Sequence, residues 1–290
     1  MSDTLRALIA APHPDVAPLP PVPRPAPGPR HLRGVPYGEV EGGRPLELDL
    51  WLPEPADGPA PLVLFVHGGA WRRGRRDDLG PRTRHWDPGP FARIAAAGLA
   101  VACADYRLSG EARFPAPLDD LRAALRWLAL RAPELGVDTA RTVVWGESAG
   151  GHLASLLALD PAVGAAGAVV WYAPSDLTLP RGPFDPRSAT TPEALLLGAA
   201  PAAVPERARA ASPVTRVHPG APPFLLVHGE RDTMVPGAHS EALAARLREA
   251  GVPVELRVVP GADHGWHGAS DVAVDEVFAR SLRFARGLGT

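Results

Sequence analysis

Apolar residues along this chain gather in short runs, and these runs alternate with stretches of amphipathic character. Continuous apolar runs cover Pro61–Val66 and Leu99–Ala104, a pattern typical of strands that are buried on both faces of a sheet. Pro117–Ala132 has helical periodicity instead, with one apolar stripe formed by Leu118, Leu121, Leu125 and Leu128. The chain therefore opens as an alternation of buried strands and surface helices.

The same alternation continues to the C-terminus. Near the start, Val35–Val40 and Leu46–Leu52 predict an antiparallel hairpin, because Gly42 and Gly43 between them form a turn signal. Further strands are expected at Arg141–Trp145, Ala168–Tyr172, Phe224–Val227 and Val254–Val259. Further helices are expected at Phe91–Ala97, Gly151–Leu159, Ala238–Ala250 and Val272–Gly287. The pattern predicts an α/β fold of about eight strands in a mostly parallel sheet, with helices on both faces.

Two segments depart from this rhythm. Residues 1–33 contain nine prolines, so we expect an extended or disordered leader, followed by one domain over residues 34–290. Residues 177–212 carry prolines and two short helical pieces, near Pro192–Leu197 and Pro205–Ala211. An insertion at this point is expected to form a small cap over the ends of the strands.

The composition and net charge of the chain limit the kinds of partner that we expect it to bind. The 290 residues are 46% hydrophobic and 21% charged with a net charge of −2, which is ordinary globular composition and argues against a nucleic-acid partner. No apolar stretch reaches membrane-spanning length, and Met1–Arg6 lacks the charged and apolar regions of a signal peptide, so we expect a cytoplasmic protein. The single cysteine, Cys103, lies in an apolar run and is expected to be a buried small hydrophobe.

Candidate chemistry centres on Gly146-Glu147-Ser148-Ala149-Gly150. A β-branched strand precedes this G-x-S-x-G pattern and a helix-forming sequence follows it, which is the context of a nucleophile elbow. The glycines remove β-carbons that would collide across so sharp a turn. Ser148 is therefore the candidate nucleophile. The alternative is a glycine-rich turn in which the serine only caps the helix.

The partners that a serine nucleophile needs have candidates at other strand ends. His67-Gly68-Gly69-Ala70-Trp71 follows a buried strand and resembles an oxyanion loop, so Gly68, Gly69 and Ala149 are the expected amide donors. His264 is the candidate base and Asp232 the candidate acid, in preference to Asp263 and Asp176. Among the other histidines, His228 is expected to have a structural or supporting role. His239 is expected to lie on a helix face, and His267 lacks the loop position that favours His264. The order Ser148, Asp232, His264 is that of the elbow hydrolases.

On these residues the chain resembles α/β-hydrolase carboxylesterases with an HGG oxyanion motif. The resemblance is nearest to the BD-FAE family, with the kynurenine formamidases and hormone-sensitive-lipase-like esterases as relatives. It extends over roughly residues 35–288 and includes Asp105-Tyr106-Arg107-Leu108, Pro174-Ser175-Asp176-Leu177 and Gly261-Ala262-Asp263-His264-Gly265. It implies an α/β-hydrolase fold and hydrolysis of acyl esters, commonly of short acyl groups, and some members act on acetylated or feruloylated polysaccharides.

The function expected from the sequence is a short-chain carboxylesterase that acts through a Ser-His-Asp triad and an acyl-enzyme on a small-molecule ester. No metal and no organic cofactor are expected, and a monomer and a dimer both stay open. Trp71, Tyr172, Val235 and Trp266 lie near strand ends and are candidates for the substrate pocket, with packing in the core as the alternative. Two other functions stay open: an N-formyl amide hydrolase with the same triad, and a ligand-binding homologue without catalysis.

Overall fold

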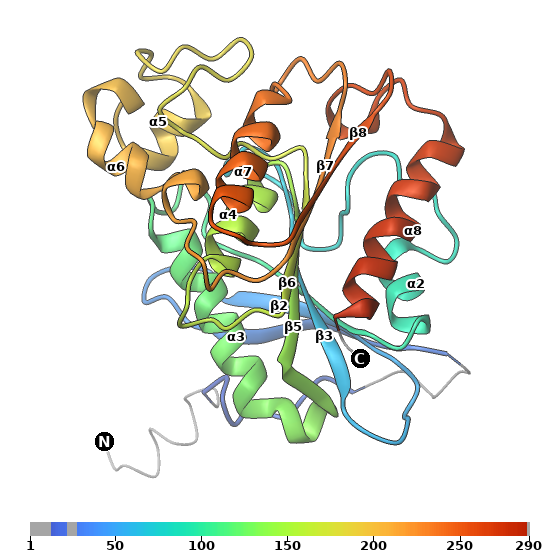
Figure 1. Ribbon diagram of the computed structural model, residues 1–290. Helices are drawn as coiled ribbons and strands as arrows, with labels where there is room; N and C mark the ends of the chain where they lie inside the picture. Colours follow the sequence, from blue (N-terminus) through green and yellow to red (C-terminus); the bar gives the residue numbers. More distant parts are fainter. Residues whose placement is uncertain (1–12, 22–27, 289–290) are drawn as a thin grey trace, which may run out of the picture.

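A computed structural model describes residues 13–21 and 28–288 of the chain (Figure 1). An eight-stranded sheet runs in the order β1-β2-β4-β3-β5-β6-β7-β8. β2 (Leu46–Leu52) pairs antiparallel with both β1 (Arg30–Gly38) and β4 (Ala100–Ala104), and all remaining pairs are parallel. The predicted mostly parallel sheet with an antiparallel N-terminal hairpin is therefore confirmed.

The five parallel strands that complete the sheet carry the site at one edge. They are β3 (Ala60–Val66), β5 (Val137–Glu147), β6 (Gly167–Trp171), β7 (Phe224–Gly229) and β8 (Val254–Val259). β3, β5 and β6 are fully apolar where they cross the middle of the sheet, because helices cover both of their faces. Their carboxyl ends meet at one edge, where open α/β sheets bind ligands.

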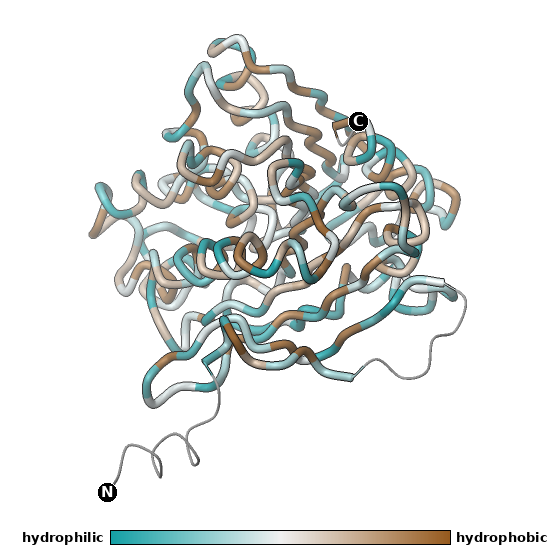
Figure 2. The backbone as a smooth tube through the Cα atoms, turned by 90° about the horizontal axis from the view of Figure 1, so that it is seen from below, coloured by the Kyte–Doolittle hydropathy of each residue, from teal (hydrophilic) through white to brown (hydrophobic). Residues whose placement is uncertain are grey.

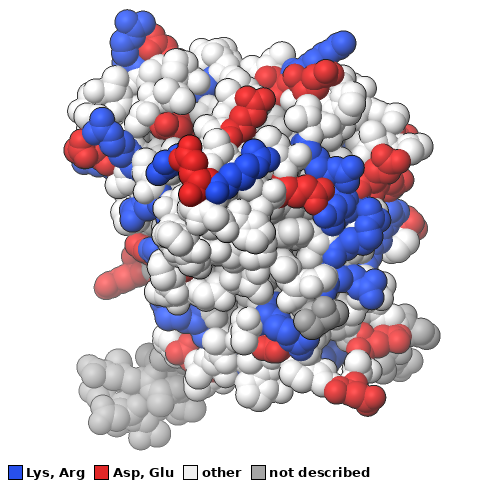
Figure 3. All heavy atoms as spheres, in the orientation of Figure 1, with Lys and Arg blue, Asp and Glu red and all other residues white. Residues whose placement is uncertain are grey.

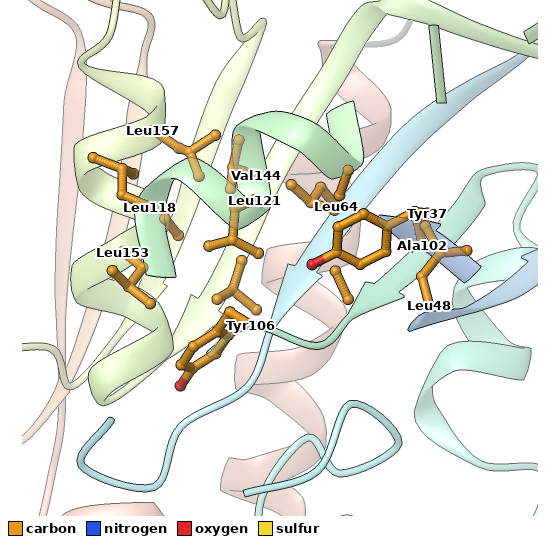
Figure 4. Packing of buried hydrophobic residues seen from close by; sticks show 14 of the residues in the cluster. Tyr37, Leu48, Leu64, Ala102, Tyr106, Leu118, Leu121, Val144, Leu153 and Leu157 are labelled. Carbon is orange, nitrogen blue, oxygen red and sulfur yellow. The ribbon is translucent and has the colours of Figure 1, made fainter. Parts of the chain in front are cut away.

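Helices form a layer on each side of the sheet (Figure 1). α3 (Ala116–Leu135), α4 (Ala149–Ala158) and α7 (Ala238–Glu249) cover one face, and α2 (Pro90–Ala96) and α8 (Asp271–Gly287) cover the other. Figure 4 shows Leu118 and Leu121 of α3 and Leu153 and Leu157 of α4 packed toward Leu64 and Val144 of the sheet. Cys103 faces the other core, among buried residues, as expected.

The leader prediction needs a correction, because part of it belongs to the folded domain. β1 starts at Arg30, inside the predicted leader, and Arg30 pairs with Leu52 of β2. Farther upstream, the carbonyl of Pro14 accepts hydrogen bonds from Trp127 Nε1 (3.0 Å) and Arg131 Nη1 (3.2 Å) of α3. Residues 13–21 are thus docked on α3, whereas the rest of the leader prediction, over residues 1–12 and 22–27, lies outside the described residues.

The insertion over residues 177–212 lies between β6 and β7 (yellow in Figure 1). It holds α5 (Pro192–Leu197), the 3₁₀ turn η1 (Pro201–Ala203) and α6 (Pro205–Ala210), so the two predicted helical pieces are confirmed. A second 3₁₀ turn, η2 (Pro213–Thr215), leads from it toward β7. The insertion is anchored at its end, because Ala211 O accepts a hydrogen bond from His152 Nε2 of α4 (2.7 Å).

Acidic and basic side chains are interspersed in Figure 3, and hydrophobic and hydrophilic stretches alternate along the tube in Figure 2. Within residues 13–21 and 28–288, no helix combines the length and apolar character that crossing a membrane requires.

Candidate active site

The elbow between β5 and α4 holds Ser148 in a strained conformation. Its backbone has φ 52° and ψ −122°, a region that residues with a β-carbon rarely adopt. The turn closes only because of its glycines: a β-carbon on Gly146 would lie 2.4 Å from Gly150 O, and one on Gly150 would lie 2.1 Å from Val66 O. The serine is thereby presented at the carboxyl edge of the sheet, at the start of α4.

Three side chains from three separate loops form one hydrogen-bonded chain. Ser148 Oγ and His264 Nε2 are 3.0 Å apart, and His264 Nδ1 and Asp232 Oδ2 are 2.8 Å apart. With the Nδ1–H donating to Asp232, the other ring nitrogen is free to accept the serine proton. These loops follow β5, β7 and β8, so the residues predicted from separate parts of the sequence meet in space.

Asp232 is held as an anion by its surroundings. Burial alone would raise the pKa of this carboxyl, but hydrogen bonds from His228, His264 and the amide of Val235 lower it well below its usual range. Oδ1 accepts the amides of Met234 (2.9 Å) and Val235 (2.7 Å), which fixes the carboxylate in one orientation. His228 Nε2 lies 3.4 Å from Oδ2 and bonds to Val235 O, so this histidine supports the acid loop.

Three of the predicted pocket residues are buried behind the site. The ring of Tyr172 packs edge-on against His264 at 4.8 Å and against Trp266 at 4.6 Å. Tyr172, Trp266 and Val235 are all fully buried and do not line the cavity in front of Ser148. The pocket prediction is therefore corrected for these three, which pack in the core. Trp71 alone of the four lies in the cavity wall.

The loop after β3 brings backbone amides to the same edge. The φ values in this loop are positive at Gly69 (110°), Ala70 (56°) and Trp71 (55°). Backbone of this kind can form a concave nest of amide groups. The amides of Gly69 and Ala70 have no acceptor among residues 13–21 and 28–288. Ala149 is the first residue of α4, where an amide lacks an intrahelical acceptor. These three amides are available to an oxyanion.

The amide of Gly68, by contrast, is already engaged. It donates to Glu147 Oε1 at 2.6 Å, and a β-carbon on Gly68 would lie 2.1 Å from the same oxygen. Its predicted role as an oxyanion donor is therefore corrected: Gly68 ties the loop to the elbow. Glu147 is half-buried in the cavity wall, and desolvation of its carboxyl raises the pKa of this group. Through its bond to the Gly68 amide, Glu147 fixes the neighbouring loop.

A cavity of about 730 Å³ opens in front of Ser148 and His264. Its wall includes the amide loop and Trp71 on one side and Pro174, Thr233 and Met234 on another. Several arginines lie in the wall, among them Arg73, Arg84 and Arg181. Arg181 comes from the insertion over residues 177–212 and was not singled out from the sequence. Within the described parts of the chain, no cluster of three or more His, Cys, Asp or Glu side chains could hold a metal ion.

The rival candidates occupy other roles. Asp263 Oδ1 accepts the amides of Thr233 (2.8 Å) and His264 (2.7 Å), so it braces the loop without reaching the imidazole. Asp176 Oδ1 bonds to Thr178, and His239 is buried beside Ser175. His267 lies in the cavity wall.

Comparison with known proteins shows what this chain is similar to. A model of the BD-FAE family matches residues 48–247. The chain is 33% identical to Esterase LipQ of Mycobacterium tuberculosis (strain ATCC 25618 / H37Rv), over 82% of this chain and 58% of that protein. It is 31% identical to Ethyl acetate hydrolase of Pseudomonas putida, over 77% of this chain and 71% of that protein. The chain thus spans less than two thirds of the length of LipQ.

Solved structures show the same fold. A truncated form of a carbohydrate esterase from gut microbiota superposes with a TM-score of 0.78 at 23% identity, over 93% of this chain and 99% of that chain. The thermophilic esterase Est2 of Thermogutta terrifontis, with butyrate bound, gives 0.72 at 25% identity, over 91% and 95%. The α/β-hydrolase fold expected from the sequence is confirmed.

Proposed function

This chain belongs to the BD-FAE family of α/β-hydrolases, and we propose that it is a carboxylesterase that cleaves short-chain acyl esters with Ser148 as nucleophile. The observation that carries the proposal is the hydrogen-bonded chain Ser148–His264–Asp232, which lies at the cavity beside unoccupied backbone amides. A nucleophile, a base, an orienting carboxylate and oxyanion donors are the parts that acyl transfer by serine requires.

Acylation follows from this geometry. Ser148 Oγ attacks the ester carbonyl carbon while its proton passes to His264 Nε2, which is 3.0 Å away. The imidazolium that forms is stabilised by Asp232, whose carboxylate accepts the Nδ1–H at 2.8 Å. His264 then gives the proton to the leaving alcohol oxygen as the carbon–oxygen bond breaks. The acyl group stays on Ser148.

The developing oxyanion is received by the amides of Gly69, Ala70 and Ala149. Fixed donors of this kind gain their effect because they already point at the position where charge appears, and removal of one costs about 2.7–4 kcal/mol in related chemistry. In the second half of the reaction, His264 takes a proton from water as the water oxygen attacks the acyl carbon. The bond from this carbon to Ser148 Oγ then breaks, His264 returns the proton to Oγ, and the acid leaves. No other group needs to enter the step.

The names and ligands of the relatives support esters as substrates and a serine mechanism. One relative is an ethyl acetate hydrolase, and Est2 has a structure with butyrate bound. Other Est2 structures carry groups from tabun, sarin and paraoxon, reagents that typically modify an activated serine. These findings concern the related proteins and make short acyl groups the substrates to test first.

The test is a series of p-nitrophenyl esters of increasing acyl length, measured for the protein and for Ser148→Ala. We expect kcat/KM to fall from acetyl and butyryl toward long chains, and the activity to be lost in the variant. Preference for long chains would contradict the short-chain assignment. Absence of hydrolysis of every ester by folded protein would contradict the esterase, and N-formyl amides would then be the next substrates to test.

A further inference from the structure

Arg181 is a buried arginine in the wall of the catalytic cavity. It belongs to the insertion between β6 and β7, and only 5% of its surface is exposed. Its Nε donates to Glu193 Oε1 of α5, its Nη1 donates to Met234 O (3.3 Å), and its guanidinium stacks on Phe184 at 4.4 Å. A guanidinium is rarely buried this deeply unless it is paired, because its desolvation is costly, and Glu193 supplies one partner.

One end of this guanidinium has no partner. The buried Nη2 donates to no acceptor among residues 13–21 and 28–288. Nη2 carries two N–H groups, and a buried donor without an acceptor costs stability unless water or a ligand takes it up. Glu193 Oε2 is likewise unpartnered, and of these two residues only Arg181 lines the cavity.

Arg181 is held firmly in this position. The next residue, Gly182, has φ +52°, and a β-carbon there would lie 2.5 Å from Thr233 O and 2.9 Å from Met234 O. The insertion therefore packs backbone to backbone against the loop that carries Asp232. Because Met234 also donates its amide to Asp232 Oδ1, Arg181 is connected to the catalytic acid through a single residue.

The cavity wall contains more hydrogen-bond donors than free acceptors. Each carboxylate there already has protein donors: Asp78 has Arg84 (2.6 Å), Glu147 has the Gly68 amide, and Asp263 has two amides. Arg73, which is also in the wall, forms no ion pair within the described parts of the chain. A ligand that complements this wall brings oxygens that only accept hydrogen bonds.

We propose that Arg181 is a specificity-determining residue that binds a carboxylate of the substrate, so that the preferred esters carry a carboxylate in addition to the scissile bond. A guanidinium edge matches the two oxygens of a carboxylate, which makes Arg better suited to this role than a point charge. The inference rests on the proposed esterase function and deepens it by naming a class of substrate.

The test compares esters that differ only in charge. One pair places the carboxylate on the acyl side (the 4-nitrophenyl monoester of glutaric acid against 4-nitrophenyl methyl glutarate), and the other on the alcohol side (4-acetoxybenzoate against its methyl ester). We expect the charged member of one pair to be favoured in kcat/KM by at least about tenfold, which corresponds to about 1.4 kcal/mol. No preference for charge in either pair would overturn the proposal.

The double variant Arg181→Met/Glu193→Gln removes the guanidinium without leaving a buried carboxylate unpaired. We expect its charged-to-neutral ratio of kcat/KM to fall to about one. The matched control is Arg187→Met, because Arg187 is an exposed arginine of the same insertion, paired with Asp185 and absent from the cavity wall, and its ratio should stay at the wild-type value. An unchanged ratio in the double variant would assign Arg181 a structural role only.

A binding measurement keeps the proposal open to refutation even if no ester is hydrolysed. Titration calorimetry of Ser148→Ala with glutarate and with glutaramide measures the dissociation constant of each compound without turnover. We expect glutarate to bind at least about tenfold more tightly, and this advantage to be lost when Arg181→Met/Glu193→Gln is added. Equal binding of the two compounds would contradict the carboxylate subsite, whereas an esterase without charge preference would leave the proposed function intact.

Discussion

Asp232 and Asp263 flank the candidate base, and only Asp232 reaches its imidazole. Asp263 precedes His264 directly, and its carboxylate turns back to cap the amides of the loop. Asp232 arrives from 32 residues earlier and lies 2.8 Å from Nδ1. The sequence supported this choice, because the order Ser148, Asp232, His264 is that of the elbow hydrolases.

Replacing each aspartate by asparagine separates these roles. Asp232→Asn keeps the shape but removes the anion that fixes the imidazole tautomer, so kcat should fall by about 10⁴-fold, the loss known for the equivalent change in a serine protease. Asp263→Asn retains an acceptor for the two amides, and we expect less than a tenfold loss. Steady-state kinetics on p-nitrophenyl acetate measures both, and a larger loss in Asp263→Asn would reverse the assignment.

Other residue-scale features were beyond the reach of sequence. The bond from the Gly68 amide to Glu147 joins two loops that are 79 positions apart, and nothing in either motif indicates which amide is consumed. The side-chain directions of Tyr172, Val235 and Trp266 depend on how three loops pack together. Strand-end position predicts that a residue lies near the site, but it does not predict whether the side chain faces the cavity or the core.

At the scale of elements, the contact between α4 and the loop after β3 positions the reacting groups. Gly150, in the first turn of α4, lies directly under the backbone of Val66 and His67. This contact sets the separation between the Ala149 amide at the start of the helix and the amides of Gly69 and Ala70. A glycine is required because any side chain would separate the two elements.

Gly150→Ala tests this dependence. The added methyl would lie 2.1 Å from Val66 O and 2.4 Å from His67 O, both backbone atoms, so the loop must shift and the oxyanion donors with it. We expect kcat/KM on p-nitrophenyl acetate to fall by at least about 100-fold, the scale of losing one oxyanion donor. Gly110→Ala is the control, since no atom lies within 4 Å of its added methyl. Near-wild-type activity of Gly150→Ala would contradict the contact.

The hydrophobic periodicity of the sequence predicted some element boundaries and not others. The buried strands and the stripe of α3 were predictable, because burial on one or two faces leaves a clear pattern. The start of β1 was not, because a register shift between Leu32 and Val35 interrupts its alternation. Docking of residues 13–21 depends on backbone carbonyls that bond to Trp127 and Arg131, and carbonyls leave no trace in a sequence.

Across the whole molecule, buried histidines join parts that lie far apart in the sequence. His152 of α4 accepts a bond from Trp71 Nε1 (3.2 Å) and donates to Ala211 O at the end of the insertion. His239 of α7 accepts the amide of Ser175 (3.2 Å) after β6. Both need a neutral ring, because one ring nitrogen must accept. The order of strands and helices was predictable from the sequence, but these hydrogen bonds between distant parts of the chain were not.

Because these histidines are buried in the neutral form, we expect the free energy of unfolding to fall in mild acid. Burial lowers the pKa of both His152 and His239 to about 4, against about 6.5 in the unfolded chain. Between these values the unfolded chain binds more protons, so the free energy of unfolding falls as the pH falls from 6.5 to 4, by up to about 3 kcal/mol for each histidine. Urea unfolding at pH 7 and 4.5 measures the difference.

A matched pair of variants identifies the source of this pH dependence. His152→Asn should show a smaller loss of unfolding free energy between pH 7 and 4.5, because one titrating group is gone. His13→Asn removes a histidine in an exposed turn and should keep the full loss. The same pH dependence in the wild type and in both variants would contradict a role for His152.

The proposed mechanism requires that Ser148 is acylated during turnover. The most direct test is rapid-quench mass spectrometry of the protein with p-nitrophenyl acetate, with peptide mapping of the trapped species. We predict a burst of p-nitrophenol and an acetyl group on the peptide that contains Ser148, both absent in Ser148→Ala and retained in Ser155→Ala, a buried serine of the same helix. Acetylation at another residue, or steady hydrolysis by Ser148→Ala, would contradict the account.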